Sequence, residues 1–261
     1  MVRDNDHHAS FLDGYRLGGN GEPIALGQTE TLANERLKSV ARRQRVVANS
    51  GRFGGFKDPL SKFPTDIEYQ LLMKKLTDLL ARSPNLPSEK RRGLVGSFEG
   101  ELLERIAYLY LSAKFLGNKI ILPPEDTVRI FSALNPSQTI NRRGMQLGLA
   151  NVSTPDMIAT NMEGTQITDI YEVAMNPLMK IETGQLDRFA EVSERTGIFL
   201  GSQVTLVHPD IGKHEALDLV SGRVELPFTY SQFRDFAAVM ETDAERSVGT
   251  IGLDKGVEIS L

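Results

Sequence analysis

The spacing of apolar residues predicts helices in the first half of the chain. Residues 29–47 (TETLANERLKSVARRQRVV) contain no glycine or proline and are rich in helix-forming residues, which predicts a basic helix. Thr65 and Glu68 have the spacing of a capping box, and apolar residues at helical intervals follow them to about residue 83. A further helix with a broad apolar face is expected from Ser97 to Gly117.

Short β-prone runs follow and alternate with helical patterns. The runs are KIILP, PDMIAT, ITDIYEVAM, QVTLVHP and RVELPF, and the helical patterns cover residues 182–196 and 231–241. This order predicts an α/β fold with a mixed β-sheet core flanked by helices. The first sixty or so residues are rich in glycine and polar residues. We therefore expect residues 1–95 to form a helical and irregular N-terminal appendage and residues 96–261 to form the core.

Composition narrows the class of protein. The 261 residues are 40% hydrophobic and 25% charged, as in globular proteins rather than disordered or repetitive ones. The chain has no cysteine, which excludes disulfide scaffolds and thiolate zinc sites and suits the reducing cytoplasm in which we expect the protein. No long apolar stretch or secretory segment occurs, so we expect no membrane insertion or export. The sequence contains no phosphate-binding glycine motif, so nucleotide-driven chemistry is not indicated.

Two carboxylates around a turn are the first candidates for chemistry. Asp156 opens one β-prone run, the turn at residues 161–164 reverses the chain, and Glu172 lies near the far end of the returning run. Counting outward from the turn pairs Asp156 with Asp169, so a bulge, a bend or a shifted register is needed to bring Asp156 to Glu172. The two carboxylates can then hold one Mg²⁺ or Mn²⁺. Two solvated acids are the alternative, and Asp169 is a structural residue or a reserve ligand.

This stretch resembles the PD-(D/E)XK nuclease superfamily, whose mark is Pro-Asp on one strand and Glu-x-Lys on the next. The match is Pro155-Asp156, fifteen residues, and then Glu172-Val173-Ala174, with alanine in the lysine position. The resemblance covers roughly residues 96 to 240. It implies a restriction-endonuclease-like core made of a helix, a three-stranded meander, a second helix and a further strand.

The resemblance also implies roles for further residues. Asp156 and Glu172 would bind the metal together with the backbone carbonyl of Val173. Gln185 and Phe189 are similar to the Gln-x-x-x-aromatic helix motif of the RecB-like exonuclease branch.

An acidic residue from the first core helix would complete the metal shell in this superfamily. The candidates are Glu99, Glu101 and Glu104. Glu99 is favoured because it shares a helix face with Leu102 and Leu103, which should pack on the sheet. The alternative is that Glu99 is an acid in the first turn of a helix, where the helix dipole favours it.

Ala174 can be explained in three ways. The lysine of the family orients the attacking water and stabilises charge developing at phosphorus, and alanine does neither. An introduced lysine-to-alanine substitution that captures an inactive form is the favoured explanation. Alternatively, the lysine has migrated to Lys180, although Lys180 also fits an exposed residue ahead of the next helix. The third possibility is a natural, non-catalytic relative.

The charge distribution indicates a nucleic-acid partner. The net charge is −4, yet residues 36–62 hold eight basic residues and one acidic residue, with Phe53 and Phe56 among them. Clustered lysine and arginine attract phosphates whatever the base sequence. The glycine-rich segment SGRFGGF is expected to be a loop that orders on DNA, although a merely solvated charged face is the alternative. The candidate contacts are Arg42, Arg43, Arg45, Arg52, Lys57, Arg91, Arg92, Arg142 and Arg143.

These features together predict a restriction-type endonuclease that uses Mg²⁺ or Mn²⁺ to hydrolyse double-stranded DNA. A homodimer or higher homo-oligomer is expected, because duplex DNA has two-fold symmetry and its two strands require two sites. The alternatives are a repair or recombination nuclease, of exonuclease, junction-resolvase or transposon end-cleaving type, and a non-catalytic nucleic-acid-binding module with the same fold. A protein-interaction scaffold is a third alternative.

Overall fold

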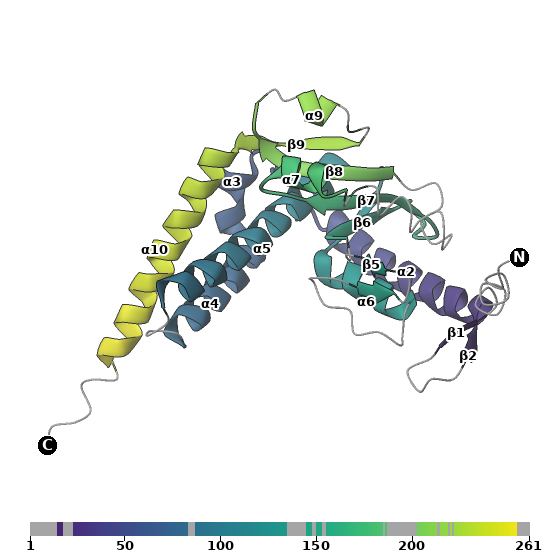
Figure 1. Cartoon of the computed structure of the whole chain (residues 1–261), viewed down its shortest axis with the longest axis horizontal. Helices are drawn as coiled ribbons and strands as arrows, with labels where there is room; N and C mark the ends of the chain where they lie inside the picture. Colours follow the sequence, from purple (N-terminus) through teal and green to yellow (C-terminus); the bar gives the residue numbers. More distant parts are fainter. Residues whose placement is uncertain are drawn as a thin grey trace, which may run out of the picture. The chain divides into compact units, whose positions relative to one another are not determined.

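The chain forms two compact units, each assembled from three segments of the sequence (Figure 1). Unit 1 contains residues 1–52, 115–172 and 178–206, and unit 2 contains residues 53–114, 173–177 and 207–261. The computed structural model describes residues 15–17, 23–82, 87–134, 145–147, 150–152, 155–184, 186, 203–212, 215–218, 220 and 222–254. Within this part of the chain, a mixed sheet runs in the order β3-β6-β7-β8-β9 and is accompanied by helices, which confirms the α/β class.

The strands of this sheet lie where the β-prone runs predict them. They are β3 (Ile120–Leu122), β6 (Met157–Thr160), β7 (Ile167–Val173), β8 (Gln203–Asp210) and β9 (Arg223–Thr229). β3, β6 and β7 are neighbours in an antiparallel meander, in which residues 123–156 separate β3 from β6 along the sequence. Every residue of β6 is buried, whereas β9 alternates exposed and buried positions, as a strand with one covered face does.

Two short hairpins were not predicted from the sequence. β1 (Tyr15–Leu17) pairs with β2 (Pro23–Ala25), and β4 (Met145–Leu147) pairs with β5 (Ala150–Val152). Runs of three residues are too short to show a period of two, so apolar spacing carries no signal for them.

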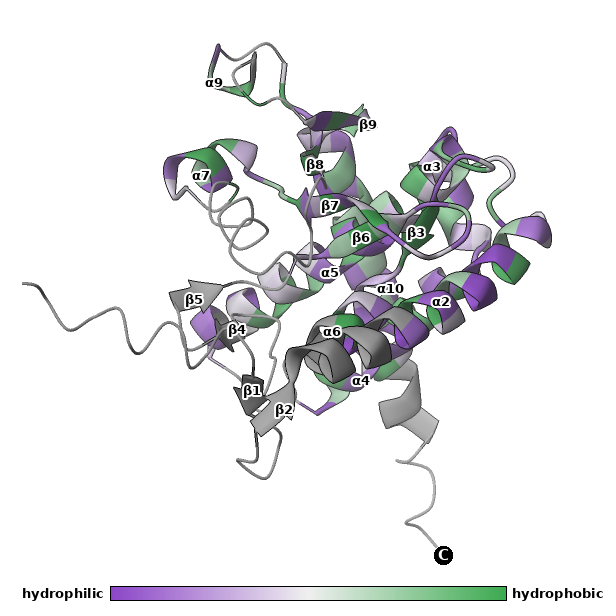
Figure 2. Ribbon diagram, turned by 90° about the vertical axis from the view of Figure 1, so that its right-hand side faces the viewer, coloured by the Kyte–Doolittle hydropathy of each residue, from purple (hydrophilic) through white to green (hydrophobic). Residues whose placement is uncertain are grey.

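The core of unit 1 forms where helix α2 (Leu26–Asn49) packs on the meander and on α6 (Pro124–Leu134). Leu37, Val40 and Ala41 make the buried stripe of α2 at helical spacing, and Figure 2 shows hydrophobic and hydrophilic residues alternating along this helix. The residues packed with them are Ile120, Leu122, Ile130, Ile158, Ile167 and Ile170. The basic helix is therefore confirmed, but it belongs to this core rather than to an appendage, because its many charges conceal a narrow apolar stripe.

A glycine allows α2 to approach the turn between β6 and β7. Gly164 has φ +70°, a left-handed conformation, and a Cβ atom placed on it would lie 2.4 Å from the Cβ of Ala41. Both the backbone conformation and the close contact therefore require glycine at this position.

Unit 2 contains a group of helices joined by aromatic residues. Its elements are α3 (Pro59–Lys62), the 3-10 helix η1 (Phe63–Thr65), α4 (Ile67–Ala81), α5 (Ser88–Lys114), α9 (Glu215–Asp218) and α10 (Tyr230–Asp254). α4 packs against both α5 and α10 (Figure 1). The ring of Phe63 lies 5.7 Å from that of Tyr69 and 6.2 Å from that of Phe236, between ring centroids, so η1, α4 and α10 share one aromatic cluster.

Two of the predicted helix starts are wrong. The N-cap of α4 is Asp66, whose carboxylate accepts a hydrogen bond from the backbone N–H of Glu68 at 2.9 Å, whereas Thr65 belongs to η1. α5 begins at Ser88, so Ser97 lies inside the helix, and the expected boundary after residue 95 falls inside it too. Glycines at positions 93 and 96 are tolerated in this helix, although glycine lowers helix propensity.

Gly164→Ala tests the close approach of the turn to α2. We expect it to lower the free energy of unfolding by about 2 to 4 kcal/mol, because left-handed strain and overpacking against Ala41 add. Gly117→Ala is the control, since Gly117 has φ +82° and open space around it. We expect Gly117→Ala to lower the free energy of unfolding only by the backbone strain, about 1 to 2 kcal/mol. Equal losses in chemical denaturation would contradict the contact with Ala41.

Candidate functional site

A β-bulge sets the register of the hairpin that carries the two candidate carboxylates. The pairing of β6 with β7 shifts between Ala159 and Thr160, and Ala159 pairs with Asp169. The pairing of Asp156 with Asp169 that direct counting predicts is therefore wrong. The shift is of the kind required to bring Asp156 toward Glu172.

Beyond the shift, the register leads to the two acids. Met157 pairs with Tyr171. Continuing this register by one residue sets Asp156 opposite Glu172, and residues opposite one another in an antiparallel pair are neighbours. Asp156 is half-buried and Glu172 is buried, with 2% of its surface exposed. The extended register thus sets two acidic residues of unit 1 opposite one another at the end of one hairpin.

A lysine completes this group. Lys180 lies in α7 (Pro177–Glu182), and its Nζ forms an ion pair with Oε1 of Glu172. The interpretation of Lys180 as an exposed residue is wrong, since its side chain is only 25% exposed, whereas most of the helix expected after it lies outside the described residues. The second oxygen of the carboxylate, Oε2, is buried and makes no hydrogen bond within the described structure.

This ion pair is part-buried, with 3% of the Glu172 side chain and 25% of the Lys180 side chain exposed. Taking two charges out of water costs about as much free energy as their attraction returns, so a buried pair is a weak source of stability. Closely interacting charged groups of low exposure occur at functional sites and in structural ion pairs alike. Sequence spacing did not reveal the pair, because eight residues separate Glu172 from Lys180 and a change from strand to helix lies between them.

Asp169, the reserve ligand, is engaged elsewhere. Nζ of Lys119 lies 2.8 and 2.7 Å from its two carboxylate oxygens and 5.3 Å from the ring centre of Phe115. The hydroxyl of Thr168 donates a third hydrogen bond to Asp169 at 2.7 Å. Asp169 is therefore structural, as one of the two alternatives held.

The residues that follow Glu172 belong to unit 2. The backbone N–H of Ala174 donates a hydrogen bond to the carbonyl of Val207 at 2.9 Å, and only 5% of Ala174 is exposed. Val173 is 8% exposed and ends β7. The side chain of a lysine at position 174 would start from an enclosed position and would have to extend out of it to expose its amine.

Glu99, the favoured ligand from the helix, has a different partner. It lies inside α5 rather than in its first turn, so the helix dipole does not account for it. Arg234 of α10 donates hydrogen bonds to both of its carboxylate oxygens. Burial raises the pKa of Glu99 above its usual range, Arg234 opposes this shift, and Glu241 adds to it. Glu101 of the same helix is paired with Lys75 of α4.

The donors at the site fit only a small metal shell. Among the described side chains, no group of three or more His, Asp and Glu residues is placed to hold a metal ion. Mg²⁺ commonly takes only one or two protein carboxylates and completes its octahedron with water and substrate phosphate. Asp156 and Glu172 fit that smaller donor set.

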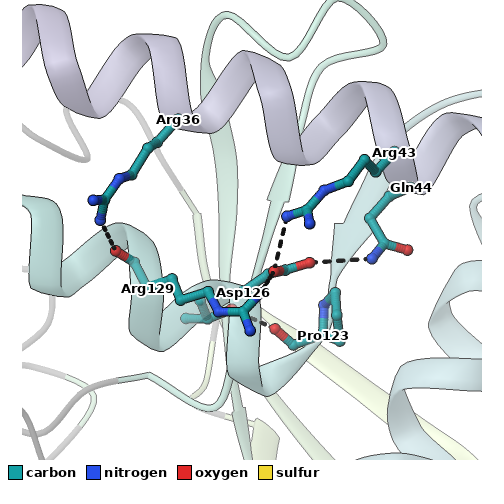
Figure 3. Close-up of polar contacts among 7 residues, drawn as sticks. Arg36, Arg43, Gln44, Pro123, Asp126 and Arg129 are labelled. Carbon is teal, nitrogen blue, oxygen red and sulfur yellow. Dashed lines mark hydrogen bonds and ion pairs between the residues drawn. The ribbon is translucent and has the colours of Figure 1, made fainter.

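A second polar cluster, which the sequence did not predict, ties α2 to α6 (Figure 3). Asp126, in the first turn of α6, accepts hydrogen bonds from Arg43 at 3.4 Å, Gln44 at 3.2 Å and Arg129 at 3.2 Å. Arg36 donates to the backbone carbonyl of Arg129 at 3.4 Å. The sequence signal that could have located Asp126 is the pair of acidic residues after Pro124, because acidic residues are favoured in the first turn of a helix.

The segment SGRFGGF is not the open loop that was expected. Phe53 and Phe56 are 4% and 1% exposed, and the ring of Phe53 meets that of Tyr108 edge-on at 5.9 Å. Both rings are core residues of unit 2 rather than contacts for bases. Alternation of phenylalanine with glycine carries no signal that separates a binding loop from a buried turn.

The remaining candidate contacts fall into two groups. Lys57 and Arg92 are exposed and Arg52 is half-buried. Gln185, Phe189, Arg142 and Arg143 lie outside the described residues, as does the side chain of Arg91 and most of the helix expected at residues 182–196.

Comparison with known protein families, with curated proteins and with solved structures finds no match to this chain. In the described part of the chain, none of the helices combines the length and the apolar character needed to span a membrane.

Glu99→Gln tests the burial of that carboxyl. A pKa raised by folding means that the folded state binds the proton more tightly, so protonation stabilises the fold and the gain disappears as the pH rises through the raised pKa. Gln copies the uncharged form at every pH. We expect the stability of the variant relative to the wild type, measured by denaturant unfolding, to increase as the pH rises above about 4.3, the ordinary pKa of a glutamic acid. A constant difference would contradict the shift.

Proposed function

We propose that this protein is a divalent-metal-dependent nuclease that hydrolyses DNA, with Asp156, Glu172 and Lys180 in its active centre. The observation that carries the proposal is the part-buried ion pair of Glu172 and Lys180, beside a hairpin whose register leads Asp156 to Glu172. The resemblance of this hairpin to the PD-(D/E)XK pattern supports the same residues.

The proposed roles follow from what phosphodiester hydrolysis requires. A bound Mg²⁺ or Mn²⁺ would supply Lewis acidity toward the phosphoryl oxygen and lower the pKa of a bound water. Asp156 and Glu172 would hold it, and the backbone carbonyl of Val173 is the further oxygen that the resemblance assigns. Glu99 is left out of the proposed shell, because both of its oxygens accept hydrogen bonds from Arg234.

In this proposal Lys180 has the role of the lysine that the resemblance expects at position 174. A cation next to the metal-binding carboxylate orients the attacking water and offsets charge that develops in the transition state. Lys180 already contacts that carboxylate, whereas position 174 is enclosed. The arrangement favours a migrated lysine over an introduced substitution or a natural loss of the catalytic residue.

The natural substrate in this proposal is double-stranded DNA, cut internally by a restriction-type enzyme that acts as a homodimer or higher homo-oligomer. Two active centres would be required to cut both strands of a symmetric duplex. Exposed basic side chains on α2 support a nucleic-acid substrate.

Cleavage of DNA by point variants tests the proposed centre. The wild type, Glu172→Gln and Lys180→Met are each incubated with supercoiled plasmid and with linear duplex in the presence of Mg²⁺ or Mn²⁺. We expect the wild type to cut the closed circle and both variants to lose about 100-fold or more of the rate, because each removes a group that acts in the transition state.

Lys119→Met is the matched control for Lys180→Met. Lys119 also pairs with a buried carboxylate of unit 1, that of Asp169, so its loss has a similar effect on folding. It should leave the cleavage rate unchanged. Equal losses in both variants would reduce Lys180 to a structural role.

Ala174→Lys distinguishes a migrated lysine from a substituted one. Activity that occurs only in this variant would identify Ala174 as an introduced inactivating substitution and overturn the role of Lys180. Digestion of linear DNA with the circle intact would indicate an exonuclease of repair type. No cleavage by any form, with folding intact, would leave the non-catalytic binding module as the function.

A further inference from the structure

The basic residues of α2 lie in two rows with different surroundings. Arg36 and Arg43 are seven residues apart, share one side of the helix, and are both engaged with α6 (Figure 3). Lys38, Arg42 and Arg45 follow one another at intervals of four and three residues, which places them together on another side. We call these three the phosphate row.

The phosphate row has no partner in the part of the chain that the structure describes. Lys38 and Arg42 are exposed and Arg45 is half-buried. None of the three is in an ion pair or hydrogen bond with a described residue, and the Nε of Arg45 is buried without an acceptor. This contrasts with Arg43, the chain neighbour of Arg42, whose guanidinium contacts Asp126.

Neighbouring acids do not neutralise the row. Glu35 precedes Lys38 by one helical turn, and Glu163 lies in the turn whose Gly164 packs on Ala41. Both side chains are exposed, and neither forms an ion pair with the row in the described structure. A protein with a net charge of −4 thus keeps three adjacent cations without counter-ions among its described residues.

The spacing of the row fits a polyanion. At about 1.5 Å of rise per residue, the three Cα atoms span about 10 Å of the helix axis. One strand of duplex DNA carries a phosphate about every 3.4 Å along its axis, so this length corresponds to about three intervals between phosphates.

We infer that Lys38, Arg42 and Arg45 form a phosphate-binding row that contacts one backbone strand of double-stranded DNA without reading its sequence. The choice of DNA as the polyanion rests on the proposed function, whereas the existence of the row does not. Arg36 and Arg43 hold α2 to α6, so only some of the basic residues of this helix bind phosphate.

Binding without metal tests the row separately from catalysis. A labelled DNA duplex is titrated with the full chain in EDTA, and fluorescence anisotropy is followed from about 50 to 200 mM salt. We expect the triple variant Lys38→Ala/Arg42→Ala/Arg45→Ala to bind at least about tenfold more weakly. The slope of log affinity against log salt should fall by about 3, one unit for each cation removed from a phosphate.

Two controls identify the cause. The variant Lys74→Ala/Arg82→Ala/Arg246→Ala removes three exposed cations of unit 2 and should keep the wild-type salt slope. Among single variants, Arg42→Ala should lower the slope by about 1 at unchanged Tm, whereas Arg43→Ala should lower the Tm and leave the slope unchanged.

Three results would overturn the inference. An unchanged slope in the triple variant would show that the row does not contact phosphate, and an equal loss in the control variant would reduce the effect to net charge. Failure of the wild type to bind DNA, together with binding to anionic lipid vesicles, would assign the row to a membrane surface. By contrast, DNA binding through the row without cleavage under metal would uphold the row and refute the proposed nuclease.

Discussion

The arrangement of unit 1 depends on the packing of α2 against the hairpin of β6 and β7. Ala41 meets the turn at Gly164, and Leu37 and Val40 cover the strands behind it. Because the turn is held in place from one side, the bulge beside it determines which residues face each other farther along the hairpin. The register that sets Asp156 opposite Glu172 thus starts from a turn that contacts α2.

The buried carboxylate of Asp126 gives α2 a second fixed point. Three side-chain donors converge on it, from two helices, and a buried carboxylate requires such donors to offset its lost hydration. The apolar stripe fixes which side of α2 faces the strands, and the contacts of Asp126 fix the position of α2 along α6. Once both are set, the remaining cations of the helix have no structural task that the described contacts reveal.

Much of the fold could be predicted from the sequence, because the deciding forces are local. The β-branched runs became strands, and the Gly-free segment before Asn49 became a helix. Features that depend on competition between neighbouring residues or on tertiary contacts could not be predicted from the sequence. Asp66 displaced Thr65 as a cap although both residue types suit that position, and the partner of Lys180 is set by the path of the chain after β7. The two acids of the candidate site were predicted from motif spacing, whereas their register required the turn to be placed first.

The interleaving of the two units along the sequence has a consequence for biosynthesis. Residues 26–49, which form α2, leave the ribosome before residues 53–114, and the strands that cover the apolar stripe of α2 are made only after those residues. Until then the strand residues that bury Leu37, Val40 and Ala41 have not been made, so these strands do not yet cover the apolar stripe of α2. Closure of unit 1 is thus a late, long-range event, which slows folding and gives chaperones a defined stretch of nascent chain to protect.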